Sequence, residues 1–318
     1  MSARSRHASI TMEKALVIVN ERARLARTTD WREGALGELG RRFETELVAP
    51  RDARDTIRRA HEAAAEGFAV VVAAGGDGTI NAVAQALART RTALGILPLG
   101  SANDLAREYG VPARIDAAAR RIAERAPRAI DLVEVDGRVF CGVGGLALVS
   151  RAALAVTRFK QWSSATRRVA NALGSHVYRL SATAALLRPW SLDDRLRIDY
   201  RDAERGERHQ FETLASVAFV TNHRTLGGGL VLPVEASAAD GVFELCYAPA
   251  RPRHSLMLNF ARLSAGAPIP DGVLVRVRAT EATIETGRDD AFVADGELLA
   301  TGRRFSVRIL PGALRLIA

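Results

Sequence analysis

The most constraining feature of the sequence is a pair of short apolar segments, each followed at once by a glycine turn and a helical pattern. Residues 68–74 (FAVVVAA) precede Gly75–Gly78, and residues 93–99 (ALGILPL) precede Gly100–Ala102. Buried strands that alternate with helices over short loops are typical of a parallel sheet covered on both faces. Because the carboxyl ends of parallel strands meet at one edge, we expect both turns to border the same crevice.

The alternation of strand and helix continues as far as Asp131 and then stops. Before that point, strand patterns also occur at 15–20 and 43–48, and helical patterns occur at 31–42, 54–66, 79–89, 103–109 and 115–125. After it, short strand patterns lie between Gly, Asp and Pro turns, at 132–135, 139–143, 196–200, 213–221, 242–248, 273–279, 283–286, 292–294 and 305–309. A long helical pattern occurs there only at 157–190.

These patterns predict two domains. Residues 1–132 should form an α/β domain around a parallel sheet, and residues 133–318 should form a mainly antiparallel β-sandwich or flattened barrel. The boundary is expected near residues 128–137, and the last strand is free to return across it.

Composition narrows the class of protein. Apolar residues make up 48% of the chain and charged residues 25%, which is typical of a globular protein. The longest apolar run, 68–74, is far below the roughly 20 residues that span a bilayer. Residues 1–14 lack the apolar core of a secretory signal, so we expect a cytoplasmic protein. Cys141 and Cys246 stand alone in apolar runs and are expected to be buried thiols.

A net charge of +9 favours an anionic partner, such as a phosphorylated substrate, a nucleic acid or an acidic membrane surface. The arginine-rich composition is also what a GC-rich genome would produce. No interleaved pattern of aromatic and basic residues indicates nucleic-acid binding, so we expect none. The only lysines are Lys14 and Lys160, which excludes a phosphate-binding loop of the GxxxxGK[ST] type.

The segment Gly75-Gly76-Asp77-Gly78-Thr79 is the strongest chemical signal. Its glycines let the backbone turn sharply, and the amides of Gly78 and Thr79 at a helix N-terminus can bind phosphate oxygens. Asp77 would repel a phosphate unless a cation lay between them, so it is expected to face the Mg²⁺ of a nucleotide or its water shell. An ordinary tight turn is the alternative that the glycines alone leave open.

The second turn adds polar groups to the same expected crevice. Ser101 can offer its hydroxyl to a phosphate, and Asn103 and Asp104 either cap the following helix or face the crevice.

These motifs, in this order, resemble the catalytic domain of diacylglycerol kinases and bacterial lipid kinases. The resemblance rests on GGDGTINAV at 75–83 and LPLGSANDLAREYGVP at 97–112, and NAD kinases and phosphofructokinases share the GGDG type of turn. It continues through Asp131-Leu132, NHRTLGGG at 222–229, Pro233, ADG at 239–241, DGE at 295–297 and the closing FSVRILPGALRL. It therefore covers essentially the whole chain, and implies a fold of the NAD kinase and diacylglycerol kinase type.

The resemblance implies an enzyme that moves the γ-phosphate of ATP, with Mg²⁺, onto a lipid hydroxyl. The implied nucleotide contacts are Asn20, Gly75, Gly76, Asp77, Gly78, Thr79, Ile80, Asn81 and Ser101. The implied catalytic base is Glu297, with Asp77 and Asp131 in the acidic network around the site. A structural Mg²⁺ in the β domain is implied at the carboxylate of Asp240 and the backbone carbonyls of Ser237 and Val242. From the residues alone, Glu297 also fits an exposed hairpin carboxylate, and Asp240 fits a simple Asp-Gly turn.

Three positions depart from the family pattern. Glu21 follows Asn20 where a proline is usual, and Gly142 stands where an asparagine is common. Leu47 takes the place of a threonine, for which Thr45 is the alternative. These departures leave two alternatives open: an altered affinity for, or choice of, nucleotide, and an inactive kinase.

Residues 159–190 carry one apolar stripe flanked by basic residues. The stripe either packs on the β domain or lies in a membrane interface and admits lipid. We therefore expect ATP, a membrane lipid and the inner face of the membrane as partners, with a homodimer also possible. The alternatives are an NAD-kinase-like enzyme acting on a soluble substrate and a non-catalytic protein that binds a nucleotide or an anionic lipid.

Overall fold

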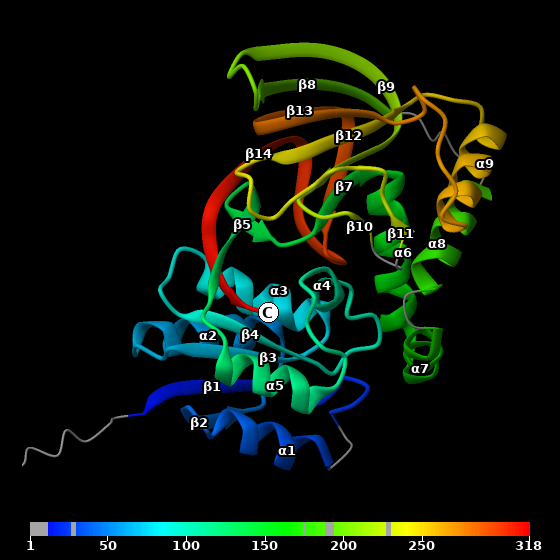
Figure 1. Ribbon diagram of the computed structural model, residues 1–318. Helices are drawn as coiled ribbons and strands as arrows, with labels where there is room; N and C mark the ends of the chain where they lie inside the picture. The colour runs from blue at the N-terminus through cyan, green and yellow to red at the C-terminus, as the bar shows by residue number, and fades with distance from the viewer. Residues whose placement is uncertain (1–11, 27–29, 174–175, 188–193, 227–229) are drawn as a thin grey trace, which may run out of the picture.

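The N-terminal half is built on a parallel sheet. The computed structural model describes residues 12–26, 30–173, 176–187, 194–226 and 230–318. Strand β1 (Glu13–Val19) lies between β2 (Phe43–Val48) and β3 (Val70–Gly75), and β3 pairs with β4 (Ala93–Pro98), all in parallel (Figure 1). Strands β1, β3 and β4 are apolar along most of their length because both faces of the sheet are covered there, whereas the edge strand β2 is more polar and partly exposed.

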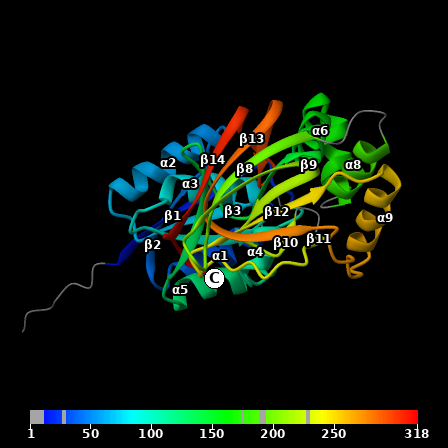
Figure 2. The same cartoon turned by 90° about the horizontal axis from the view of Figure 1, so that it is seen from above.

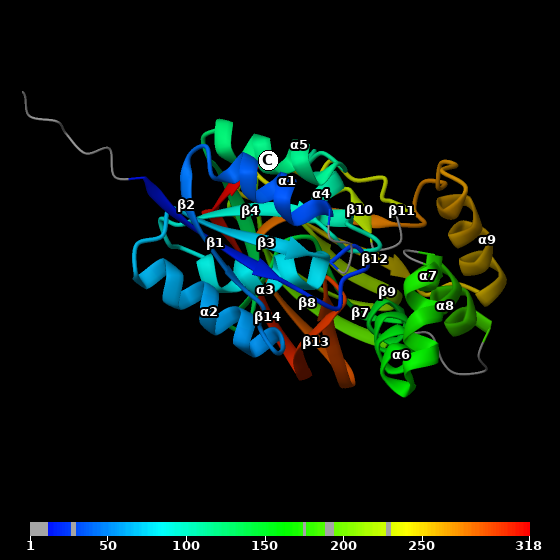
Figure 3. The same ribbon diagram turned by 90° about the horizontal axis from the view of Figure 1, so that it is seen from below.

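Two pairs of helices cover those faces. Helices α1 (Asp30–Leu39) and α5 (Ile115–Glu124) pack on one face, and α2 (Ala53–Ala65) and α3 (Asp77–Leu87) pack on the other (Figure 3). Alternate strand residues enter the two cores: Val17 and Val72 lie with α1 and α5, whereas Ile18 and Val71 lie with α2 and α3. A short helix, α4 (Asp104–Glu108), follows β4.

The C-terminal half is mainly antiparallel. Its strands are β5 (Arg128–Val135), β6 (Arg138–Phe140), β7 (Val143–Ala147), β8 (Asp194–Asp202), β9 (Arg208–Thr221), β12 (Phe243–Pro249), β13 (Val275–Ala294) and β14 (Glu297–Ile317), with a small pair, β10 (Thr225–Leu226) and β11 (Leu230–Val231). They enclose a core in which Phe140, Phe243, Phe292 and Phe305 are almost fully buried.

Four helices gather along one side of this half (Figure 1, Figure 2). They are α6 (Leu148–Trp162), α7 (Ser164–Leu173), α8 (His176–Leu187) and α9 (Arg253–Ser264). The predicted helical stretch is thus three helices that begin earlier than expected, and its last residues, 188–190, lie outside the described residues. Helix α9 was not predicted. In the described parts of the chain, no helix is both long and apolar enough to cross a membrane.

Strand β14 joins the two halves into one sheet. Its residues 297–308 pair antiparallel with β13 and its residues 307–316 pair antiparallel with β5, while its final residues, 315–317, pair in parallel with residues 93–95 of β4. The sheet therefore runs β12-β9-β7-β13-β14-β4-β3-β1-β2. The expected return of the last strand is confirmed, and Cys141 and Cys246 are buried free thiols as predicted.

Candidate active site

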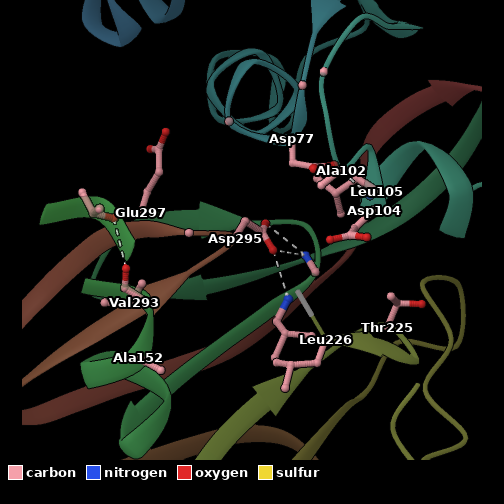
Figure 4. A pocket seen from close by; sticks show the side chains of 18 of the residues that line it. Asp77, Ala102, Asp104, Leu105, Ala152, Thr225, Leu226, Val293, Asp295 and Glu297 are labelled. Atoms are coloured by element: carbon pink, nitrogen blue, oxygen red, sulfur yellow. Dashed lines mark hydrogen bonds between the residues drawn. The ribbon is translucent and has the colours of Figure 1, made fainter. Parts of the chain in front are cut away.

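A cavity of about 1090 Å³ lies between the two halves and is lined by both. The N-terminal half contributes the GGDGT turn and the turn after β4, and the C-terminal half contributes the tip of the β13–β14 hairpin (Figure 4). The crevice predicted at the carboxyl ends of β3 and β4 is therefore confirmed as one wall of a larger cavity.

The two glycine turns approach each other closely. A Cβ on Gly100 would lie 2.5 Å from the Cα of Gly76, and a Cβ on Gly75 would lie 2.4 Å from Oγ1 of Thr79. Side chains at these positions would force the turns apart, so the glycines are needed for packing as well as for ligand approach. Helix α3 starts at Asp77 beside this contact, and its N-terminus opens onto the cavity.

Asp77 ties the two turns together. Its Oδ1 accepts the backbone N–H of Leu105 at 2.9 Å, and its side chain points toward the second turn in Figure 4. The end of β1 is linked to the first turn through Asn20, whose Nδ2 donates to Oγ1 of Thr79 at 3.1 Å. The backbone amide of Thr79, predicted as a phosphate donor, instead bonds the Gly76 carbonyl within the first turn of α3.

The second turn is shaped by Asn103. This residue has a positive φ of 51°, and its Nδ2 donates to the carbonyls of Pro98 and Gly100. It does not cap α4 through its side chain. Ser101 and Asp104 line the cavity, and Asp104 also pairs with Arg107.

The opposite wall is a two-residue hairpin. Asp295 and Gly296 connect β13 to β14 with φ values of 48° and 83°, the left-handed geometry that an Asp-Gly pair favours. The Asp295 carboxylate accepts backbone N–H groups from Cys141, Gly142 and Val143, where the strand predicted at 139–143 is interrupted. These bonds fix the hairpin tip against the neighbouring strands.

This contact explains the departure at Gly142. A Cβ on Gly142 would lie 2.6 Å from Oδ1 of Asp295, so a larger side chain cannot occupy the position while Asp295 keeps its bonds. Glu21 lines the cavity and lies 4.0 Å from Arg32, whereas Leu47 is exposed on β2 and does not line the cavity.

Glu297 is half-buried and faces the GGDGT turn from the other half of the molecule. A Cβ on Gly78 would lie 3.4 Å from Oε1 of Glu297, so the carboxylate stands directly opposite this turn. Burial raises the pKa of Glu297; the positive charge of Arg138 opposes this effect and the negative charge of Asp295 adds to it. The structure thus places Glu297 in the cavity rather than at an exposed hairpin. A carboxyl group with a raised pKa holds a proton more tightly, which suits a proton acceptor.

Beyond these carboxylates, one part of the cavity is apolar. Helices α6, α8 and α9 and strand β9 turn inward a set of side chains that includes Leu148, Ala152, Leu186, Phe219, Leu256 and Phe260. Within the 159–190 stretch, Ala170, Ala182 and Leu186 line this wall. Most of the predicted apolar stripe does not: its members Trp162 and Leu187, for example, are exposed.

A polar cluster crosses between the halves at the cavity. Glu108, at the end of α4, accepts the N–H of Arg224 and the hydroxyl of Thr225, and lies 3.7 Å from Nδ1 of His223. The buried His223 ring also bonds the Tyr109 hydroxyl through Nε2 at 2.9 Å. The His223 ring, helped by the Thr225 hydroxyl, lowers the pKa of Glu108 to about 2 despite partial burial. None of these contacts was anticipated, because they join residues more than a hundred positions apart.

Three of the expected nucleotide contacts do not reach the cavity. Ile80 and Asn81 are fully buried within α3, and Gly75 lies behind the turn. Many lining residues were missed, among them Arg22, Arg24, Arg51 and Thr56 at the same end of the cavity as the glycine turns. Arg22, Arg24 and Arg51 follow the ends of β1 and β2, so basic residues just after predicted strands were the signal that could have identified them.

Asp131 also lies away from the cavity lining. It is buried in β5, and its carboxylate accepts the N–H groups of Gly241 and Gly312, both at 2.7 Å. Both carboxylate oxygens thus hold the backbone of neighbouring loops, and Asp131 does not line the cavity.

The expected cation site at Ser237, Asp240 and Val242 is likewise outside the cavity lining. Asp240 Oδ2 pairs with Nη2 of Arg278 at 2.7 Å, and Oδ1 accepts the N–H of Val242 at 3.3 Å. Over the described residues, no cluster of three or more His, Cys, Asp and Glu side chains could hold a metal ion.

Comparison with known proteins identifies the family. The model of the diacylglycerol kinase catalytic domain matches residues 14–135, and that of the YegS C-terminal NAD kinase beta sandwich-like domain matches residues 161–318. A probable lipid kinase YegS-like of Pseudomonas aeruginosa is 31% identical over 264 residues, which cover 82% of this chain and 80% of the relative. The chain belongs to the diacylglycerol kinase family. The probable lipid kinase YegS of Escherichia coli is 31% identical over 281 residues, 82% of each chain.

A solved structure shares the fold of this family member. A putative diacylglycerol kinase from Bacillus anthracis superposes with a TM-score of 0.78 at 22% sequence identity, covering 98% of this chain and 97% of that one. The predicted fold class, an α/β half with a parallel sheet followed by an NAD-kinase-like β-sandwich half, is confirmed.

The Glu108 cluster generates a stability prediction. The pKa of Glu108 in the folded chain, about 2, lies below the ordinary value of 4.5, so its contribution is complete above pH 4.5 and is lost as pH falls toward 2. We expect Glu108→Gln to lower the free energy of unfolding at neutral pH by ~1–3 kcal/mol and to weaken the acid dependence. Urea denaturation across this pH range measures both effects.

Glu46→Gln is the matched control, because Glu46 forms an exposed pair with Lys14. Its free energy of unfolding should stay within about 0.5 kcal/mol of wild type. A Glu108→Gln variant that loses stability in parallel with wild type as the pH falls would contradict the assignment.

Proposed function

We propose that the protein transfers the γ-phosphate of ATP to a lipid hydroxyl, with Glu297 as the general base. The observation that carries the proposal is the continuity of one cavity. It joins the N-terminus of α3 and Asp77 to the carboxylate of Glu297 and then to an apolar wall. A phosphoryl donor, a proton acceptor and a hydrocarbon chain could therefore meet in one enclosed space.

The nucleotide end combines positive charge with a helix terminus. The start of α3 offers partial positive charge for phosphate, and Arg22, Arg24 and Arg51 line the same end of the cavity. Mg²⁺ would arrive with ATP, and the Asp77 carboxylate, which lines this end of the cavity, would face it. When bound, the ion would neutralise charge that develops on the phosphate oxygens.

The acceptor end is built around Glu297. The lipid hydroxyl would give its proton to the Glu297 carboxylate while its oxygen bonds the γ-phosphorus and the bond to ADP breaks. A positioned base of this kind usually contributes ~10²–10⁴-fold to the rate. Asp295, held by three backbone N–H groups, keeps the hairpin tip in place so that Glu297 stays opposite Gly78.

The apolar wall supports a lipid rather than a soluble acceptor. Each methylene removed from water contributes ~0.8 kcal/mol, so an acyl chain in this part of the cavity would supply most of the binding energy. The same wall has no role with a soluble dinucleotide, which disfavours the NAD-kinase-like alternative. The related proteins of P. aeruginosa and E. coli carry the name probable lipid kinase, in keeping with this reading.

Transfer to a lipid requires access to a membrane. Helices α6 to α8, which line the cavity inside, also carry exposed apolar side chains outside: Trp162 (83% exposed), Val169 (50%), Leu180 (57%) and Leu187 (61%). We propose that this surface meets the inner face of the membrane as a peripheral contact, with the positive net charge favouring acidic lipids.

The kinase proposal predicts that Glu297→Gln abolishes most phosphoryl transfer, by ~10²-fold or more, because no carboxylate then accepts the proton. Transfer of radiolabelled γ-phosphate from Mg·ATP to diacylglycerol, phosphatidylglycerol and a sphingoid base in mixed micelles, with an NAD reaction alongside, measures it. Glu285→Gln, on an exposed pair with Arg304, should keep wild-type activity. Label in NAD alone, or equal rates for Glu297→Gln and wild type, would refute the proposal.

The membrane proposal predicts that Trp162→Ala/Leu180→Ala weakens binding to vesicles containing phosphatidylglycerol by about tenfold or more, since two large apolar groups no longer enter the interface. Co-sedimentation measures this. Leu47→Ala, which removes an apolar side chain exposed on β2, serves as the control. Equal binding by the double variant and the control would count against this surface.

A further inference from the structure

The loop between β11 and β12 is held by two arginines of β13. Arg276 donates from Nη1 to the carbonyl of Pro233 at 2.6 Å, and Arg278 donates from Nη2 to Oδ2 of Asp240 at 2.7 Å. Residues two apart on a strand lie on the same face, so both guanidinium groups reach the loop together. One arginine therefore holds the start of the loop and the other holds its end.

Arg278 also serves a buried carboxylate. It pairs directly with Glu244 in the β12–β13 register, and its Nε lies 3.9 Å from Oε1 of Glu244. Glu244 is only 4% exposed, and burial raises its pKa while the charges of Arg276 and Arg278 oppose that rise. A carboxylate this deeply buried needs a positive charge beside it. Arg278 thus bridges Asp240 and Glu244, as a cation between two carboxylates would.

This arrangement does not fit the structural Mg²⁺ that the family resemblance implied at Asp240. The ion needs carboxylate and carbonyl oxygens that are open to it. Here one oxygen of Asp240 is taken by Arg278 and the other by the Val242 amide. A divalent cation would have to displace a guanidinium group that already satisfies Asp240 and lies beside Glu244.

The loop matters because hydrogen bonds connect it to Asp131 in β5. The N–H of Asp131 donates to the Ala238 carbonyl, and the Gly241 N–H donates to Oδ2 of Asp131. Asn222 in turn donates from Nδ2 to the carbonyl of Asp131 at 3.0 Å. These hydrogen bonds link the loop to β5 and to Asn222, which follows β9.

Two further bonds complete the connection to the hairpin. The N–H of Asn222 donates to the Gly142 carbonyl at 3.1 Å, and the N–H of Gly142 donates to the Asp295 carboxylate. Asp295 stands two residues before Glu297. A loop that moved would thus disturb the hairpin that carries the proposed base.

We propose that the Arg278 guanidinium takes the place of a divalent cation at this loop, so that the folded chain needs no structural Mg²⁺ there. A guanidinium is always charged and covalently attached, so its presence does not depend on the free Mg²⁺ concentration. Arg278 is accordingly a positioning residue, and the only Mg²⁺ the enzyme would require is the ion that accompanies ATP.

The test is thermal unfolding of the full chain without nucleotide, with EDTA or with millimolar Mg²⁺. If Mg²⁺ raises the Tm of wild type at all, the same rise should be seen in Asp240→Asn. Arg278→Ala removes the guanidinium and leaves both carboxylates open to an ion. Its Tm should be lower in EDTA and should rise by about 2 °C or more in Mg²⁺, as expected for an ion that binds the folded state alone.

Two matched variants isolate the site. Arg304→Ala breaks an exposed pair elsewhere in the β half and should respond to Mg²⁺ as wild type does. In Arg278→Ala/Asp240→Asn the Mg²⁺ response should disappear. A wild-type rise in Tm that Asp240→Asn removes, or an Arg278→Ala variant that folds but ignores Mg²⁺, would overturn the proposal.

A second measurement does not require that Arg278→Ala folds. The phosphoryl-transfer rate of wild type, at constant Mg·ATP, should not increase with free Mg²⁺ once all ATP is complexed. Activation by free Mg²⁺ that Asp240→Asn abolishes would overturn the proposal. The Tm readout needs no catalysis, so a failure of the proposed kinase activity stays distinguishable from a failure of this inference.

Discussion

Strand β14 is the element on which the rest of the structure depends. It begins at Glu297 in the cavity and ends paired in parallel with β4, so one continuous strand carries the proposed base and completes the N-terminal sheet. Because the GGDGT turn follows β3, which pairs with β4, the base and the turn are fixed relative to each other through adjacent strands. A site shared by two halves of a chain thereby gains the rigidity of a single sheet.

Most of the carboxylates described at the cavity are held by hydrogen bonds to nearby loops. Asp295 uses backbone N–H groups, Glu108 uses His223 and Thr225, and Asp77 uses the Leu105 amide. Each of these carboxylates fixes a loop, whereas the carboxylate of Glu297 is partly buried and stands opposite the turn proposed to bind phosphate. This contrast is why Glu297, among the acidic residues that line the cavity, is the one assigned to proton transfer.

The sequence was most informative where local patterns decide the structure. Buried strands ending in glycine turns predicted both the parallel sheet and the meeting of the two turns at one crevice, whereas the bond from the Leu105 amide to Asp77 was not predicted. It was least informative for the long strands. The irregular pairing between Glu285 and Asp290 resembles a turn and divided the strand predicted for β13, and the strand predicted for β14 covered only 305–309 and ended before the irregular pairing that follows Leu310. Helix α9 was also not predicted, because Pro252 precedes it and no capping side chain marks its start. The partners of Asp131 and Asp240 could not be predicted, because tertiary contacts bring them together.

In the proposed reaction, the phosphate donor and the lipid acceptor meet between the GGDGT turn and Glu297. The most direct test is a crystal structure with Mg²⁺, a non-hydrolysable ATP analogue and a diacylglycerol analogue that has a free hydroxyl. We expect the γ-phosphate at the N-terminus of α3, the acyl chain along α6, α8 and α9, and the hydroxyl within ~2.6–3.2 Å of a Glu297 oxygen. A lipid bound outside this cavity, or a hydroxyl directed away from Glu297, would contradict it.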